Sequence, residues 1–161
     1  MELANLIVIM GSKSDMEIAE KVKVSAEQFG LTVSLHIASA HKTAHHLLKI
    51  LDEYEAQNNA HVYVTIAGRS NALSGFVDGY VNYPVIACPP ASAAFGGADI
   101  FSSLRMPSGV APAVVLEPEN AALLAAKILS MNDASIKDNV TKYKAKQMEK
   151  IIKDDRELNG K

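Results

Sequence analysis

The feature that most constrains the fold is the stretch from Leu6 to Asp15, LIVIMGSKSD. Its first five residues are all apolar, a pattern typical of a strand in a parallel sheet whose two faces are both covered. Gly11 then interrupts the run, and residues with hydroxyl, amino and carboxyl groups follow. We therefore expect a buried strand that ends in a ligand-binding turn, with a helix after the turn.

The turn offers groups that suit a phosphorylated small molecule. Gly11 lets the backbone bend, Ser12 and Ser14 carry hydroxyls, and the free N–H groups at the start of the next helix favour an anion such as phosphate. A phosphate repels a carboxylate, so Asp15 has two natural roles: capping the helix or accepting hydrogen bonds from ribose hydroxyls. We favour the ribose, and an N-cap at Ser14 or Asp15 is the structural alternative.

Strand-like and helical patterns alternate along the rest of the chain. The further expected strands are 31–38, 61–67, 85–88 and 113–116, and the expected helices are 16–29, 43–58, 72–80, 117–131 and 135–158. Thr43 is a candidate N-cap, and the stretch 91–109 is expected to be a packed loop with a short helix over 97–105. This alternation predicts an α/β fold with one domain over residues 1–161 and a parallel sheet between layers of helices.

Polar loops follow the first three expected strands, at Gly11–Asp15, Ser39–Lys42 and Gly68–Asn71. Ligands of parallel α/β sheets bind at the carboxyl ends of the strands. We therefore expect these three loops to share one pocket.

The last expected helix, 135–158, is highly charged but carries an apolar stripe. A single domain has little core left for such a stripe to cover, so we expect it to pack on a neighbouring subunit. The members of the stripe are Ile136, Val140, Tyr143, Met148, Ile151 and Ile152.

Composition narrows the class of partner. A net charge of −2, with no isolated basic cluster, argues against nucleic acid. The apolar start is too short for a signal peptide or a membrane span, and a single cysteine excludes an internal disulfide. We expect a cytoplasmic protein that acts on small molecules.

The three polar loops also contain groups suited to catalysis. His41 is the residue there whose side chain ordinarily titrates near neutrality, so it is the candidate general acid or base; a histidine after a strand also serves as a capping or surface residue. Lys42 and Arg69 supply positive charge for a phosphate or carboxylate, or lie solvated on the surface. Ser70 and Asn71 offer donors for an oxyanion, although Ser-Asn after a turn is also ordinary turn chemistry.

Other sequence signals point away from common cofactors. The histidines and acidic residues show no metal-ligand spacing, so we expect no metal. Neither Gly-x-x-x-x-Gly-Lys nor Gly-x-Gly-x-x-Gly occurs, so ATP and NAD are not supported. Cys88, beside two prolines, is interpreted as a small buried side chain rather than a nucleophile.

Four motifs together resemble the PurE family of purine biosynthesis. They are GSKSD at Gly11–Asp15, SAHK at Ser39–Lys42, AGRSN at Ala67–Asn71 and SSLRMPSG at Ser102–Gly109, in the family's order. The family has a mutase class and a carboxylase class. Lys42, the AGRSN loop and the CPP at Cys88–Pro90 are similar to the carboxylase class, whereas the mutase class has Arg after SAH and a Gly-rich loop.

The resemblance implies a three-layer αβα sandwich with a flavodoxin-like parallel sheet and a homo-oligomer of four or eight chains that share active-site residues. It implies carboxylation of 5-aminoimidazole ribonucleotide (AIR) at C4 by CO₂, giving 4-carboxy-5-aminoimidazole ribonucleotide (CAIR), without ATP, biotin or metal. His41 resembles the family's base and acid. Ser12, Asp15, Ser39 and Lys42 match positions that hold the ribose phosphate, and Gly68, Arg69, Ser70 and Asn71 match the end that receives CO₂.

Three alternatives remain at this stage. The first is the mutase that rearranges N5-carboxyaminoimidazole ribonucleotide. The second is a non-catalytic flavodoxin-like module, either flavin-binding or a receiver domain; a receiver needs an Asp where the third strand ends, and this chain has Ala67-Gly68 there. The third is an assembly protein, for which the polar loops would have no explanation.

Overall fold

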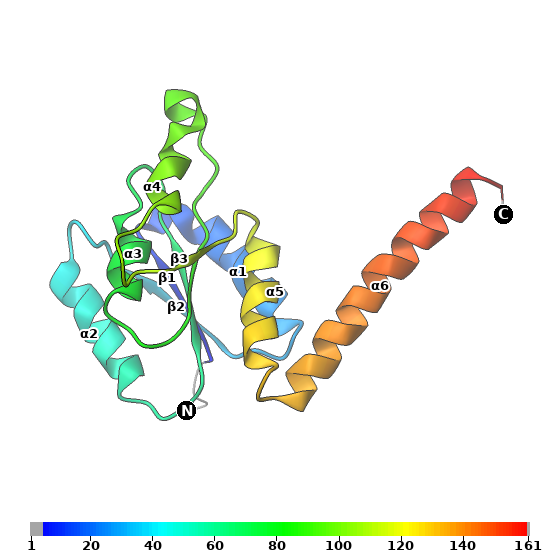
Figure 1. The fold of residues 1–161 in the computed structure, drawn as a ribbon, viewed down its shortest axis with the longest axis horizontal. Helices are drawn as coiled ribbons and strands as arrows, with labels where there is room; N and C mark the ends of the chain where they lie inside the picture. Colours follow the sequence, from blue (N-terminus) through cyan, green and yellow to red (C-terminus); the bar gives the residue numbers. More distant parts are fainter. Residues whose placement is uncertain (1–4, 161) are drawn as a thin grey trace.

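The computed structural model describes residues 5–160, which form a sheet with helices on both sides (Figure 1). The sheet has five strands in the order β2-β1-β3-β4-β5, and every neighbouring pair is parallel. The strands are β1 (Leu6–Met10), β2 (Val33–Ile37), β3 (Val62–Ile66), β4 (Val85–Ala87) and β5 (Ala113–Val114). This topology confirms the predicted α/β sandwich with a flavodoxin-like sheet.

Helices connect the strands, with two short 3₁₀ segments between them. The helices are α1 (Met16–Glu27), α2 (Ala44–Glu55), α3 (Ala72–Asp78), α4 (Phe101–Leu104), α5 (Pro118–Leu129) and α6 (Ala134–Leu158), and the 3₁₀ segments are η1 (Lys13–Asp15) and η2 (Ala94–Ile100). Each expected strand and helix is present, with ends that differ by a few residues. None of the helices in this part of the chain has the length and apolar character needed to cross a bilayer.

The central strand β1 is buried on both faces, as its apolar run predicted. Leu6, Val8 and Met10 point into a core formed with α1, α5 and the first turns of α6. Ile7 and Ile9 point into a second core formed with α2 and α3. Successive residues of a strand face opposite sides of a sheet, so the run without alternation follows from having helices on both sides.

The segment 91–109 does not form the packed loop that its apolar residues suggested. It rises beyond the carboxyl ends of the strands, with η2 toward its outer end and α4 nearer the body of the molecule (Figure 1). Phe95 is 89% exposed and Phe101 is 70% exposed, and Phe95, Gly96 and Gly97 have positive φ angles. The expectation was wrong for this chain because these side chains find no core within it.

The long helix α6 divides into two parts. Ile136 and Val140 are buried against α1 and α5, the ring of Tyr143 packs edge-on against Phe29, and the Asn139 side chain donates to the Phe29 carbonyl. The expectation that the whole stripe lacks a core within its own chain was therefore wrong for its first half. The second half extends away from the body of the molecule (Figure 1), and Met148, Ile151 and Ile152 are exposed there.

Candidate active site

A pocket of about 530 Å³ lies where β1, β2 and β3 end. These strands are neighbours in the sheet and run in the same direction, so their following loops meet at one edge. The pocket is lined by Gly11, Ser12, Ser14, Asp15, Ser39, His41, Lys42, Gly68, Arg69 and Ser70, together with Ala40, Ala67 and Leu73. Every predicted site residue except Asn71 therefore lines one cavity. The three apolar residues of the wall carry no chemical group that sequence reasoning could single out.

Asp15 turns its carboxylate back toward the start of its own loop. Oδ2 accepts hydrogen bonds from the Ser12 N–H at 3.1 Å and the Ser12 hydroxyl at 3.3 Å, and the Ser12 hydroxyl also bonds that of Ser14. Asp15 occupies the N-cap position of α1, yet its side chain makes no capping hydrogen bond to that helix. The carboxylate forms a capping box with Ser12 at the start of η1, so the structure shows a capping role for Asp15, and its role in ribose binding stays a prediction.

The two ends of the loop after β2 are joined by hydrogen bonds. The Thr43 hydroxyl accepts from the Ser39 N–H at 2.8 Å, the Thr43 N–H donates to the Ser39 carbonyl, and the Lys42 N–H donates to the Ser39 hydroxyl. The Thr43 side chain thus closes this loop and makes no capping bond to α2, contrary to expectation. His41 and Lys42 project from this closed loop and are exposed.

The loop after β3 contains a residue in a conformation that side chains rarely adopt. Arg69 has φ 58°, in the left-handed region that costs a non-glycine residue roughly 1 kcal/mol. Such conformations persist only where surrounding contacts enforce them, and they are frequent at functional sites. The guanidinium of Arg69 is carried by this loop at the edge of the pocket.

Asn71 is buried beneath the pocket. It is 3% exposed, its Oδ1 accepts from the N–H and hydroxyl of Ser74, and its Nδ2 donates to the hydroxyl of Ser103. The amide caps α3 through Ser74 and contacts α4 through Ser103, so its hydrogen bonds are made within the protein. Its place in the loop was predictable from the motif, whereas the direction of its side chain was not.

The pocket combines two fixed cations with one carboxylate. Lys42 and Arg69 belong to different loops, and Asp15 belongs to the third. This arrangement suits a small molecule that has an anionic group and several hydroxyls. His41, on the same loop as Lys42, also lines the pocket.

The titratable groups outside the pocket add no reactive or metal-binding group to the candidate site. Burial, with the nearby Glu117 and Glu119 carboxylates, raises the pKa of the Cys88 thiol to about 12, so the thiol is protonated at neutral pH and is not a ready nucleophile. Burial lowers the pKa of His36, whose Nε2 lies 2.8 Å from the Tyr54 hydroxyl. Residues 5–160 contain no group of three His, Cys, Asp or Glu side chains placed to hold a metal ion.

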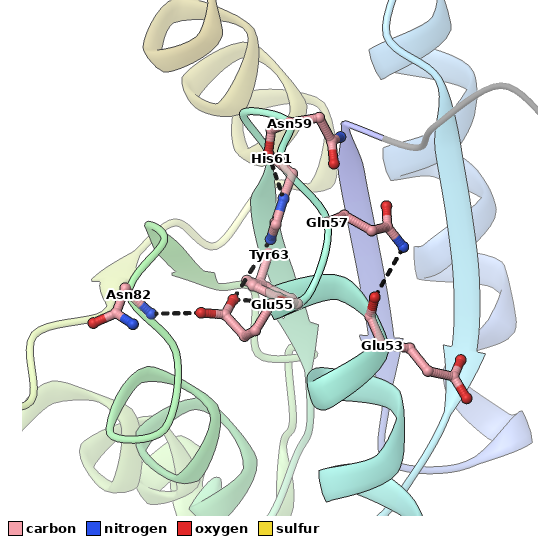
Figure 2. Close-up of polar contacts among 7 residues, drawn as sticks. All are labelled: Glu53, Glu55, Gln57, Asn59, His61, Tyr63 and Asn82. Atoms are coloured by element: carbon pink, nitrogen blue, oxygen red, sulfur yellow. Dashed lines mark hydrogen bonds and ion pairs between the residues drawn. The ribbon is translucent and has the colours of Figure 1, made fainter.

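A second polar cluster lies at the opposite end of β3 (Figure 2). The Glu55 carboxylate at the end of α2 accepts from the Tyr63 hydroxyl and the Asn82 N–H, both at 3.1 Å, and lies 3.6 Å from His61 Nε2. The other ring nitrogen of His61 donates to the Asn59 carbonyl at 3.0 Å. Because the candidate pocket is at the carboxyl ends of the strands, we interpret this second cluster as part of the support of the fold.

The cluster predicts a loss of stability in alkali. Burial and the Glu55 carboxylate raise the pKa of Tyr63, so its phenol stays neutral in the folded protein above about pH 10, where the unfolded chain loses that proton. The unfolded state then binds fewer protons, and the free energy of unfolding falls by up to about 1.4 kcal/mol per pH unit. Urea unfolding at pH 9 to 11 measures this, and Tyr63→Phe should flatten the profile; an equal slope in both proteins would contradict it.

Comparison with known proteins identifies the family. The family model described as AIR carboxylase matches residues 5–150. A phosphoribosylaminoimidazole carboxylase of Treponema denticola is 57% identical over 95% of this chain and 96% of its own, and one of Archaeoglobus fulgidus is 52% identical over 94% of this chain and 83% of its own. The crystal structure of Treponema denticola PurE has a TM-score of 0.94, with 95% of this chain and 97% of that chain covered. The chain belongs to the AIR carboxylase family.

Proposed function

We propose that the protein carboxylates AIR at C4 with CO₂ to give CAIR in purine biosynthesis, without ATP. The observation that carries the proposal is the convergence of His41, Lys42 and Arg69 on one 530 Å³ pocket. Membership of the AIR carboxylase family supports this substrate. A carboxy-lyase of this kind acts on a small molecule within the pocket, and the pathway and the single buried thiol suit the cytoplasm.

The loops after β1 and β2 are placed to bind the ribose phosphate. Ser12 and Ser39 offer hydroxyls, and Lys42 offers a cation for the phosphate. Asp15 accepts two hydrogen bonds from Ser12 in the free protein. On binding, ribose hydroxyls can take the place of Ser12 as donors, which releases the Ser12 N–H toward the phosphate.

We expect Asp15→Asn to raise the KM for AIR by roughly 10-fold to 100-fold, because a charge-assisted hydrogen bond of about 1.5–3 kcal/mol is weakened. Steady-state kinetics measure this. Glu17→Gln, which neutralises an exposed carboxylate on α1 outside the pocket, is the control and should change the KM by less than twofold. An unchanged KM in the Asp15 variant would remove it from ribose binding.

The chemistry needs one base and a well-placed CO₂. The amino nitrogen of AIR pushes electron density to C4, which attacks the carbon of CO₂; a C–C bond forms and a C=O electron pair moves to oxygen, giving a carboxylate. C4 then carries both a proton and the carboxylate. His41 takes that proton, the C–H electron pair restores the aromatic ring, and the protonated His41 returns a proton to C4 in the reverse direction.

The loop after β3 is placed to hold CO₂ and the new carboxylate. Gly68, Arg69 and Ser70 line the same pocket as His41, which the loop after β2 carries. Positioning a neutral gas against a carbon nucleophile is mainly a matter of orientation, and fixed donors stabilise the charge that develops on oxygen. Asn71 contributes from beneath, by fixing the loop.

An absorbance assay without ATP tests the function against the mutase alternative. One arm supplies AIR with increasing dissolved CO₂, and the other supplies N5-carboxyaminoimidazole ribonucleotide. CAIR formation that rises with CO₂ supports the carboxylase, and turnover of the carbamate alone identifies a mutase. The relatives' names favour the first outcome.

We also propose that the protein is a homo-oligomer of four or eight chains, joined in part by the outer half of α6. Its exposed apolar residues support an interface. Deleting 146–161 removes Met148, Ile151 and Ile152 and keeps the buried first half, so we expect light scattering to show dissociation toward a single truncated chain, lighter than the 17.3 kDa of the full chain. Met131→Lys, at an 83% exposed site outside α6, is the control. An unchanged assembly after the deletion would exclude this interface.

A further inference from the structure

A chain of hydrogen bonds runs through the core beneath the pocket, from β3 to α4. The Ser74 hydroxyl donates to Asn71 Oδ1 at 2.9 Å, and the Ser74 N–H donates to the same oxygen at 3.2 Å. The Ser74 hydroxyl has a single proton, so the Thr65 hydroxyl, 2.8 Å away, is the donor to Ser74. The Ser74 N–H fixes the Asn71 amide orientation, and Nδ2 therefore donates to the Ser103 hydroxyl at 2.9 Å.

The four side chains that form this series of hydrogen bonds are all buried. Thr65 and Ser74 are 0% exposed, Ser103 is 2% exposed and Asn71 is 3% exposed. Burying polar groups is unfavourable unless each finds a partner, and a satisfied network of this kind holds its members in one geometry. Four buried polar residues at one place therefore fix the position of the backbone that bears them.

That backbone is the strained loop of the pocket. Asn71 follows Ser70 and the left-handed Arg69. The Asn71 N–H donates to the Ser102 hydroxyl at 3.0 Å, and the same hydroxyl oxygen lies 3.2 Å from the Arg69 carbonyl. The two adjacent serines of α4, the serine pair, thus both accept hydrogen bonds from Asn71. Ser102 accepts from its backbone N–H, and Ser103 accepts from its side-chain amide.

We propose that Ser103, with Ser74 and Thr65, is a positioning residue that acts through Asn71 to hold the Arg69 loop in its catalytic geometry. The docking of α4 then sets the shape of one wall of the pocket. On either side of the serine pair, Phe101 and Leu104 are exposed, so the two serines are the part of α4 that fastens it to the site. The inference rests on the proposed function for its kinetic effect only.

The expected kinetic effect is a split between kcat and KM. Ser103→Ala leaves the Asn71 Nδ2 donor without its acceptor and loosens the Arg69 loop, while the loops that bind ribose phosphate are untouched. We expect kcat to fall by roughly 10-fold to 100-fold, the KM for AIR to stay within about threefold, and the CO₂ concentration for half-maximal rate to rise. Ser103→Thr keeps the hydroxyl and should recover most of kcat.

Hydrogen exchange without substrate tests the same inference independently of the reaction. In Ser103→Ala and in Ser74→Ala, the amides of Asn71 and Ala72 should exchange at least 10-fold faster, relative to the β3 amides of the same variant. Val77→Ala is the matched control, because Val77 is fully buried on α3 and its truncation destabilises the core without touching the chain of hydrogen bonds.

The outcomes separate the two proposals. Faster loop exchange in both serine variants, and not in the Val77 control, supports the positioning role even if the wild-type protein fails to carboxylate AIR. Loop exchange equal to wild type, or a kcat loss in Val77→Ala as large as in Ser103→Ala, overturns it. If Ser103→Ala does not fold, Ser74→Ala decides by the same criteria.

Discussion

The His41→Asn variant is expected to bind AIR with an affinity close to that of the wild type and to lose about 10³-fold in kcat. Asparagine keeps a polar side chain of similar reach, so the loop at Ser39–Lys42, which its own hydrogen bonds close, should keep its shape. It cannot accept the proton from C4, and general base catalysis contributes about 10²–10⁴-fold. CAIR formation by absorbance measures kcat, and calorimetry measures the affinity.

His45→Asn is the matched control for this variant. His45 is exposed on the first turn of α2 and does not line the pocket. The same substitution there should leave kcat within about twofold, since it lies outside the chemistry. Near-normal turnover by His41→Asn would show that another group removes the proton.

The layers of the fold could be predicted because local sequence patterns and tertiary packing agree. The apolar run of β1 already required a cover on both faces, and the recurring apolar residues of α1, α2 and α5 supplied it. The ends of elements were less predictable. The strand expected over 31–38 is Val33–Ile37, and the helix expected over 16–29 ends at Glu27, before a turn in which Gly30 has φ +84°.

Two segments departed from expectation, in opposite directions. Phe95 and Phe101, expected in a packed loop, are exposed in the chain on its own, whereas Ile136 and Val140 of α6, expected to lack a core within the chain, are buried. Composition shows that such residues favour burial, but it does not say whether the surface that buries them belongs to the same chain.

The site could be predicted at the level of loops, and less well at the level of side chains. Parallel strands bring their carboxyl ends together whatever the details, so the positions of the three loops followed from the strand pattern. The roles of Thr43 and Asn71 depend on which way a side chain turns. Ser103 was marked only as part of the SSLRMPSG motif, which indicated no role for it, because its partner is Asn71, 32 residues earlier in the chain.

The Glu55→Ala variant is expected to lower the free energy of unfolding by about 3 kcal/mol. Figure 2 shows that the carboxylate is directed at the side chain of Tyr63, the backbone of Asn82 and the ring of His61. Alanine leaves the phenol of Tyr63, whose residue is 0% exposed, without its acceptor. Removing one partner of a buried polar group costs about 1–3 kcal/mol for each donor left unpaired, and more where charge is involved.

Glu53→Ala is the control for this effect, because the Glu53 side chain is exposed on the same helix and points away from the cluster in Figure 2. It should change the free energy of unfolding by less than about 0.5 kcal/mol. Urea unfolding followed by circular dichroism measures both variants at one protein concentration, since association would add to apparent stability. A Glu55→Ala protein as stable as Glu53→Ala would mean that the cluster is satisfied without the carboxylate. If Glu55→Ala lowers the free energy of unfolding strongly but leaves kcat of the folded protein unchanged, then this end of β3 supports the fold and the other end carries the catalysis.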